Sequence, residues 1–121
     1  MQPLAEEPRF DVSVERLDGE SVVVFRGELD MSATDELSRS IEKVRSPDRP
    51  LIIDLAGTTF MDSSGVHVLL TAYRAQGRGP GSVVLRSPSH AVRYTLALTG
   101  VADALTIDDG AGSVDPPQPT R

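Results

Sequence analysis

The sequence predicts an α/β fold, a mixed and largely parallel sheet of about four or five strands with about three or four helices packed on it. Two stretches with strand character come first and are separated by a turn. After them, apolar runs of strand length alternate with stretches of helical periodicity. Such alternation favours parallel strands joined by crossover helices. The 121 residues suffice for one domain with a core of its own.

The first two strands are expected to form a hairpin. Phe10, Val12 and Val14 alternate with polar residues, which is typical of a strand with one buried face. Residues 17–20 carry the turn signal Leu-Asp-Gly-Glu, and the apolar run 22–25 follows as the second strand.

A helix and a buried strand come next. Residues 32–35, Ser-Ala-Thr-Asp, resemble a capping box and predict the helix start. Pro47 and Pro50 end the helix, and residues 51–55 form an apolar run expected to be a central strand buried on both sides. The apolar positions of the helix repeat at one face: Leu37, Ile41 and Val44.

A second helix starts after residues 62–65, Asp-Ser-Ser-Gly, and the glycines from Gly77 to Gly81 end it. Residues 82–85 form the next strand. Val68 and Ala72 lie off the expected buried face of this helix and are available for an apolar contact. The positions expected on that buried face are Val66, Leu69, Leu70 and Tyr73.

Pro88 and Ser89 open a third helix, which Gly100 ends, and residues 104–107 are expected to form a last short strand. Val92, Leu96 and Thr99 share one side of that helix. The domain therefore spans 9–108. Residues 1–8 and 109–121 are rich in proline, glycine and polar residues and are expected to be flexible tails.

The composition narrows the classes of function. A net charge of −6 argues against direct nucleic-acid binding, which requires a basic surface. The chain has no cysteine, and its two histidines, His67 and His90, lack the spacing of metal ligands, so neither a metal nor a cofactor is expected. No apolar run approaches the length of a bilayer span, and no signal peptide is evident. We expect a cytoplasmic protein that does not enter membranes.

Residues 62–65 are the most informative segment for function. Asp62 and Ser63 precede a helix, where their side chains can simply cap free backbone amides. The same position also suits a phosphate, because the start of a helix favours negative charge. Gly65 costs about 0.5–1 kcal/mol relative to alanine inside a helix, so its bare backbone is expected to be needed for a close approach.

Two segments together resemble a known family. Residues 27–30, Gly-Glu-Leu-Asp, are followed some thirty residues later by residues 61–66, Met-Asp-Ser-Ser-Gly-Val. The spacing and the order of elements, from about Phe10 to Asp108, resemble the STAS-domain anti-sigma factor antagonists. The resemblance implies the STAS fold.

The resemblance also implies a function. In this family the serine after the aspartate, here Ser63, is phosphorylated by a partner that is both an anti-sigma factor and a serine kinase. The unmodified antagonist binds that partner and thereby releases the sigma factor; phosphorylation weakens binding, and a serine phosphatase restores it. Asp30 corresponds to the family's partner-binding acidic residue, although it is equally suited to cap a helix. Asp62, Ser64 and Gly65 match the remaining motif positions.

His67 departs from the family pattern, which often has a small residue there. It shares one face of the predicted second helix with Thr71, Arg74 and Arg78. This face is either a solvated polar surface or the rim of a partner contact that includes His67 and Arg74.

Two other classes of function were compared with the antagonist. A hydrolase is disfavoured, because no G-x-S-x-G motif surrounds Ser63 and no acid is placed to orient His67. A STAS scaffold that is never phosphorylated stays open as the alternative. We expect the protein to be a monomer and a ligand of other proteins, not an enzyme.

Overall fold

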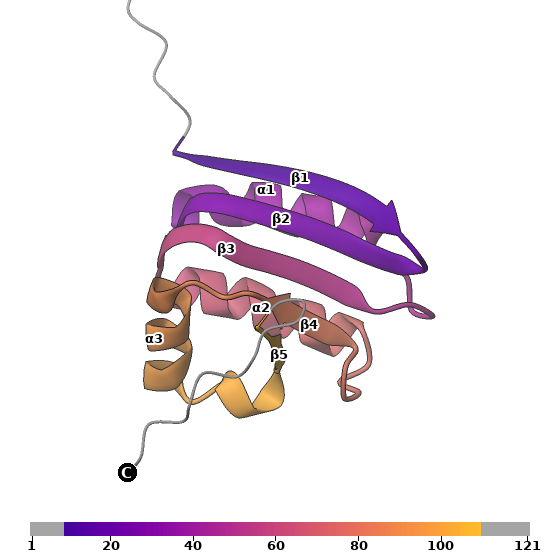
Figure 1. The fold of residues 1–121 in the computed structure, drawn as a ribbon. Coiled ribbons are helices and arrows are strands. Elements are labelled where there is room, and N and C mark those ends of the chain that lie inside the picture. The colour runs from indigo at the N-terminus through magenta and orange to yellow at the C-terminus, as the bar shows by residue number, and fades with distance from the viewer. Residues whose placement is uncertain (1–8, 110–121) are drawn as a thin grey trace, which may run out of the picture.

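The computed structural model describes residues 9–109 and shows a mixed sheet with the strand order β1-β2-β3-β4-β5 (Figure 1). β1 and β2 are antiparallel, and each later strand is parallel to its predecessor. The predicted α/β class is confirmed. Nearly all of the expected tails, 1–8 and 109–121, lies outside the described residues. The elements are β1 (Phe10–Leu17), β2 (Glu20–Leu29), α1 (Met31–Val44), β3 (Leu51–Met61), α2 (Ser63–Ala75), β4 (Val83–Arg86), α3 (His90–Thr99), a 3₁₀ turn (Ala102–Ala104) and β5 (Thr106–Asp108).

Crossover helices join the parallel strands, which follow one another in the sheet in chain order. Each parallel neighbour is reached through a helix, and right-handed connections in one direction place those helices on the same face. Figure 1 shows α1 and α2 behind the sheet, and the three helices share one core cluster with it. The sheet contributes to that core mainly Val23, Phe25, Leu29, Ile53, Leu55 and Leu85, each fully buried.

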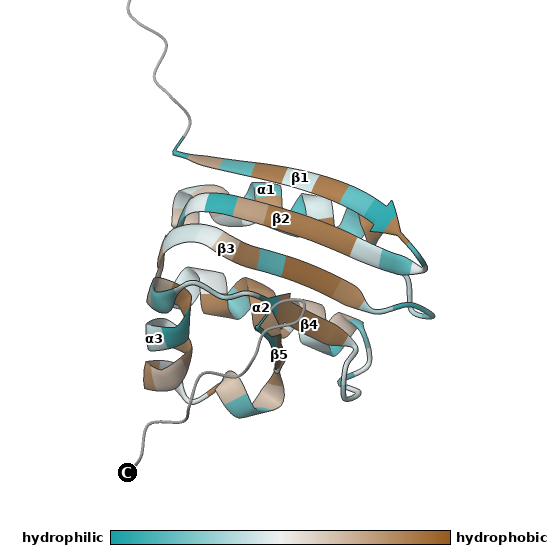
Figure 2. Ribbon diagram, in the orientation of Figure 1, coloured by the Kyte–Doolittle hydropathy of each residue, from teal (hydrophilic) through white to brown (hydrophobic). Residues whose placement is uncertain are grey.

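β2 and β3 each contain a long hydrophobic stretch (Figure 2). Leu51, Ile52 and Ile53 are all buried, although alternate side chains point to opposite faces. The predicted central strand buried on both sides is therefore confirmed. On the face opposite the core cluster, Arg86 forms an ion pair with Asp54 at 3.2 Å.

β2 and β3 extend well beyond the runs 22–25 and 51–55 that hydropathy picks out. After two register shifts, Glu28 pairs with Phe60 and Leu29 pairs with Met61. Backbone pairing continues there because each strand supplies a ladder partner for the other, whatever the side-chain pattern. The extension brings residues 27–30 and 61–66 side by side.

Three local predictions are wrong in detail. Ser32 does not cap α1: Asp30 does, and its carboxylate accepts a hydrogen bond from the Ser32 amide. Val68 and Ala72 are 7% and 4% exposed and belong to the core, because α1 packs against α2. The last strand begins at Thr106, because residues 102–104 form the 3₁₀ turn.

The third helix agrees with expectation. Ser89 caps α3 by accepting a hydrogen bond from the Val92 amide, and Gly100 ends it in the left-handed conformation with φ 77°. Among residues 9–109, no helix has both the length and the hydropathy needed to cross a lipid bilayer.

Candidate functional site

The carboxyl ends of β2 and β3 deliver two helix starts to one edge of the sheet. Leu29 is paired with Met61, and the amide of Asp62 donates to the carbonyl of Leu29 at 3.4 Å. Asp30 then caps α1, and Asp62 caps α2 in almost the same backbone conformation. Ligands of open α/β sheets usually bind at such an edge.

Ser63 is the first residue of α2, and its side chain is exposed. The carboxylate of Asp62 accepts a hydrogen bond from the Ser64 amide at 2.9 Å. Within the described part of the chain, the Ser63 hydroxyl makes no hydrogen bond of its own. The helix cap expected of Asp62 is therefore present, and the serine hydroxyl is left accessible.

Gly65 is buried between the ends of the two strands. A Cβ at this position would lie 2.7 Å from the Cγ of Met61 and 2.8 Å from the Cγ of Leu29. The close approach expected at this glycine thus comes from two core side chains of the protein itself. Gly65 therefore allows α2 to pack directly against Leu29 and Met61, the paired residues that precede the two helix caps.

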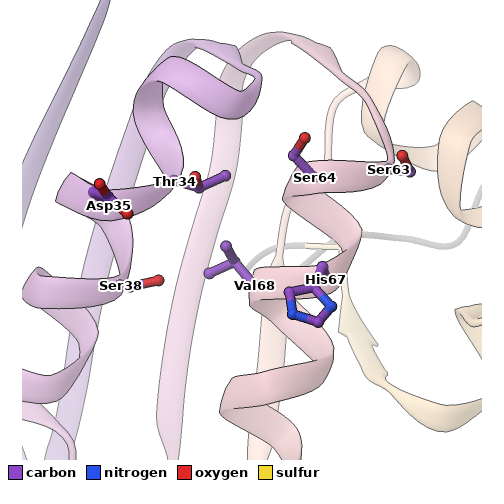
Figure 3. A pocket seen from close by; sticks show the side chains of 7 residues that line it. All are labelled: Thr34, Asp35, Ser38, Ser63, Ser64, His67 and Val68. Atoms are coloured by element: carbon purple, nitrogen blue, oxygen red, sulfur yellow. The ribbon is translucent and has the colours of Figure 1, made fainter.

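An open polar groove of about 540 Å³ separates the first halves of α1 and α2 (Figure 3). Hydroxyl groups, one carboxylate and one imidazole line its walls. The lining residues are Thr34, Asp35 and Ser38 of α1, and Ser63, Ser64, His67 and Val68 of α2. Such a groove can receive polar side chains of a partner.

The α1 wall of this groove was missed by sequence reasoning. Thr34 and Ser38 are one helical turn apart, on a different face from the buried Leu37 and Ile41. That polar spacing was readable, but nothing local indicates that α1 lies beside α2. Only the parallel pairing of β2 with β3 brings the two walls together.

The predicted site residues lie in two places: at the sheet edge with its groove, and further along α2. Ser63, Ser64 and His67 line the groove, while Asp30 lies at the same edge as the start of α1. Arg74 is exposed and lies seven residues beyond His67, about 10 Å along the helix axis. Its side chain donates to the Thr71 hydroxyl at 3.4 Å, and it does not line the groove.

Arg9 lies beside two of the carboxylates at this edge of the sheet. Its guanidinium lies 2.6 Å from the carboxylate of Glu28 and 3.7 Å from that of Asp30. Hydrogen bonds from the Ser32 hydroxyl and amide hold the pKa of Asp30 below its ordinary value of 3.8, and the positive charge of Arg9 acts in the same direction.

This pKa predicts the pH dependence of stability. A carboxyl whose pKa is lowered by folding stabilises the native state at pH values above its pKa in the unfolded chain. That contribution is lost as the pH falls through the lower pKa of the folded state. Asp30→Asn keeps a capping side chain but removes the charge. We expect the variant to have a lower melting temperature than wild type at pH 6–7, and we expect this difference to shrink below about pH 3.8. Thermal melts from pH 3 to 7 measure this, and a difference independent of pH would contradict it.

Within residues 9–109, no group of three or more histidine, aspartate or glutamate side chains is arranged to hold a metal ion. The functional groups at this edge include an accessible hydroxyl, several carboxylates and the open groove between the two helices.

Comparisons with known proteins agree with this arrangement. An anti-sigma factor antagonist from Mycobacterium paratuberculosis superposes with a TM-score of 0.74 at 29% identity, covering 84% of this chain and 86% of that one. The unphosphorylated form of the anti-sigma factor antagonist SpoIIAA gives a TM-score of 0.63 at 25% identity, with coverage of 80% and 87%.

The same fold also occurs in a different setting. The murine anion transporter Slc26a9 matches with a TM-score of 0.66 at 16% identity over 80% of this chain, but over only 17% of its own length. That likeness concerns the fold alone. The model of the STAS domain family matches residues 11–113, and the chain therefore belongs to the STAS domain family.

Proposed function

We propose that this protein is an anti-sigma factor antagonist switched by phosphorylation of Ser63. The unmodified form binds an anti-sigma factor that is also a serine kinase and makes it release its sigma factor. A serine phosphatase reverses the modification. The observation that carries the proposal is the exposed, unengaged hydroxyl of Ser63 at the start of α2, in a chain similar to proteins described as anti-sigma factor antagonists.

The position is suited to a kinase substrate. A kinase must bring a phosphoryl donor to about 3–3.5 Å from the attacking oxygen, which requires an accessible hydroxyl. Ser63 meets that requirement, because α2 begins at the sheet edge and its first side chain projects beyond the core. The protein then acts as the substrate and ligand of its partner, not as the catalyst.

A phosphate on Ser63 changes the partner surface without disturbing the core. It adds about −1.5 to −2 charges next to Asp62 and across the edge from Asp30. The amides at the start of α2 partly offset that charge within the protein. A partner docked on the same edge meets both the added bulk and the added charge, so its binding weakens. A coupling of about 1–3 kcal/mol corresponds to an affinity change of about 5–150-fold.

Within this proposal the remaining site residues have distinct roles. Asp30, Ser64 and His67 contact the partner from the edge and the groove, and Arg74 extends that contact along α2. Asp62 supports the contact by capping α2, and Gly65 by allowing the close packing beneath it.

Phosphorylation mapping tests the proposal. The protein is incubated with purified anti-sigma factor serine kinases of its source organism and ATP, and the phosphate is located by mass spectrometry. We expect wild type and Ser64→Ala to be labelled and Ser63→Ala to lose at least nine-tenths of the label, because Ser63 carries the acceptor hydroxyl.

The matched serine variant makes the outcome specific. Strong labelling of Ser63→Ala would show that the acceptor is elsewhere. Binding of a kinase without any labelling would favour the alternative, a STAS interaction module that is not phosphorylated. If no such kinase binds the unmodified protein, the proposed function is wrong.

A further inference from the structure

Elements that end or begin at the Ser63 end of the sheet carry several exposed apolar side chains. Six large hydrophobic residues in the described part of the chain are exposed, and four of them belong to elements that meet at this end. They are Met31 (76% exposed), Phe60 (47%), Tyr94 (61%) and Leu98 (69%). Met31 directly follows the cap Asp30, and Phe60 lies two residues before the cap Asp62.

α3 contributes two of these side chains. Its inner face packs Val92 and Leu96 into the core, whereas Tyr94 and Leu98 are one turn apart on a different, exposed face. Both side chains are directed away from the core, and contiguous exposed apolar patches are typical of surfaces that bind other proteins.

A hydrogen bond fixes the distance from α3 to the candidate site. The Thr95 hydroxyl donates to the carbonyl of Met61 at 2.8 Å. Ser63 is two residues further on, a reach of at most about 7 Å. Tyr94 adjoins Thr95 in sequence, and Leu98 lies one turn along the helix. Figure 1 shows α3 at the same end of the sheet as the carboxyl ends of β2 and β3.

A protein partner that reaches Ser63 has to cover more than the groove. A stable interface buries about 800 Å² on each partner, which as a disc has a radius of roughly 16 Å. A surface of that size centred on Ser63 extends beyond the groove between α1 and α2, and α3, which is hydrogen-bonded to Met61, is an adjacent element on which it can continue. A few residues near the centre of an interface carry most of the binding energy, and tyrosine is enriched among them.

We infer that the kinase proposed above binds α3 as well as the groove, with Tyr94 and Leu98 as apolar anchors of the contact. The inference rests on the proposed function and adds a second surface to it. The same edge of the sheet carries the carboxylates of Glu28, Asp30 and Asp62, and the guanidinium of Arg9 beside the first two offsets only part of their negative charge. The partner surface that fits is therefore an apolar patch flanked by basic groups.

Binding measurements with a matched control test the inference. The probe is a purified anti-sigma factor kinase that labels Ser63 of the wild-type protein, and calorimetry gives its affinity for the unmodified protein. We expect Tyr94→Ala/Leu98→Ala to raise Kd at least tenfold and to raise the KM for Ser63 phosphorylation with little change in kcat. The control, Leu17→Ala, removes an exposed leucine (48%) from the end of β1 that lies far from the candidate site. It should change Kd less than twofold.

The results separate the inference from the proposed function. If the double variant binds as tightly as Leu17→Ala while Ser63 is still labelled, α3 lies outside the contact and the inference is wrong, although the function stands. If sedimentation shows a wild-type dimer that the double variant abolishes, the patch serves self-association and the inference is also wrong. If no kinase binds or labels the wild type, both proposals fail. Thermal melts within about 3 °C of wild type show that the variants are folded.

Discussion

Gly27→Ala is expected to destabilise the protein by about 3 kcal/mol, the largest loss we predict for a single added methyl group. Gly27 has φ 106°, and a Cβ there would lie 2.2 Å from the carbonyl oxygen of Arg9 and 2.7 Å from the Cα of Phe10. Unfavourable backbone conformation costs about 1–3 kcal/mol, and forced overlap about as much again.

The overlap at Gly27 cannot relax easily, because the obstructing atoms are backbone. The amide of Glu28 donates to that same Arg9 carbonyl at 3.1 Å, so moving the start of β1 away breaks a hydrogen bond. It also withdraws the Arg9 guanidinium from Glu28 and Asp30. The substitution therefore weakens the fold and the candidate site together.

Urea denaturation monitored by circular dichroism measures the effect, and Gly19→Ala is the control. Gly19 also has positive φ, 80°, but a Cβ there meets no atom within 4 Å. The control should lose about 1 kcal/mol through backbone strain alone. Equal losses in the two variants would show that the contact with β1 is not what requires glycine at position 27.

Gly65→Val is expected to destabilise the protein by about 2–3 kcal/mol and to reduce phosphorylation of Ser63. The added side chain would overlap the side chains of Met61 and Leu29, both of which are buried in the core. These two residues precede the caps Asp62 and Asp30. Displacing them shifts the starts of α2 and α1, so the geometry presented to the kinase changes as well.

Two further glycine variants separate packing from helix preference. Gly65→Ala adds one methyl group to the same crowded position, but alanine favours the helix by up to about 1 kcal/mol, so its loss should be smaller. Gly79→Ala meets no atom within 4 Å and should leave the free energy of unfolding within about 0.5 kcal/mol. A Gly65→Val protein as stable as wild type would contradict the packing argument.

Much of the fold could be predicted from local signals. The alternation of Phe10, Val12 and Val14, the apolar run 51–55 and the cap at Ser89 each depend on neighbours within a few residues. The segment 62–65 was likewise recognisable as a helix start, with Asp62 as its cap. Local patterns suffice there, because helix caps and strand alternation are short-range interactions.

The start of α1 shows where local signals mislead. Ser32 and Asp35 have the spacing of a capping box, yet Asp30 is the cap, because β2 continues to Leu29 and leaves Asp30 at the turn into the helix. Val68 and Ala72 show the same limit on α2. Their burial depends on α1, a neighbour that no pattern within α2 reveals.

By itself, the sequence determined the order of the elements, the polar helix start at Asp62 and Ser63, and the need for glycine at position 65. Only the tertiary structure decided that the strands run on to Leu29 and Met61, because that pairing joins segments more than thirty residues apart. The same pairing sets the two capped helices side by side and opens the groove between them. The site is thus a product of sheet register, a long-range property that hydropathy and spacing along one segment do not contain.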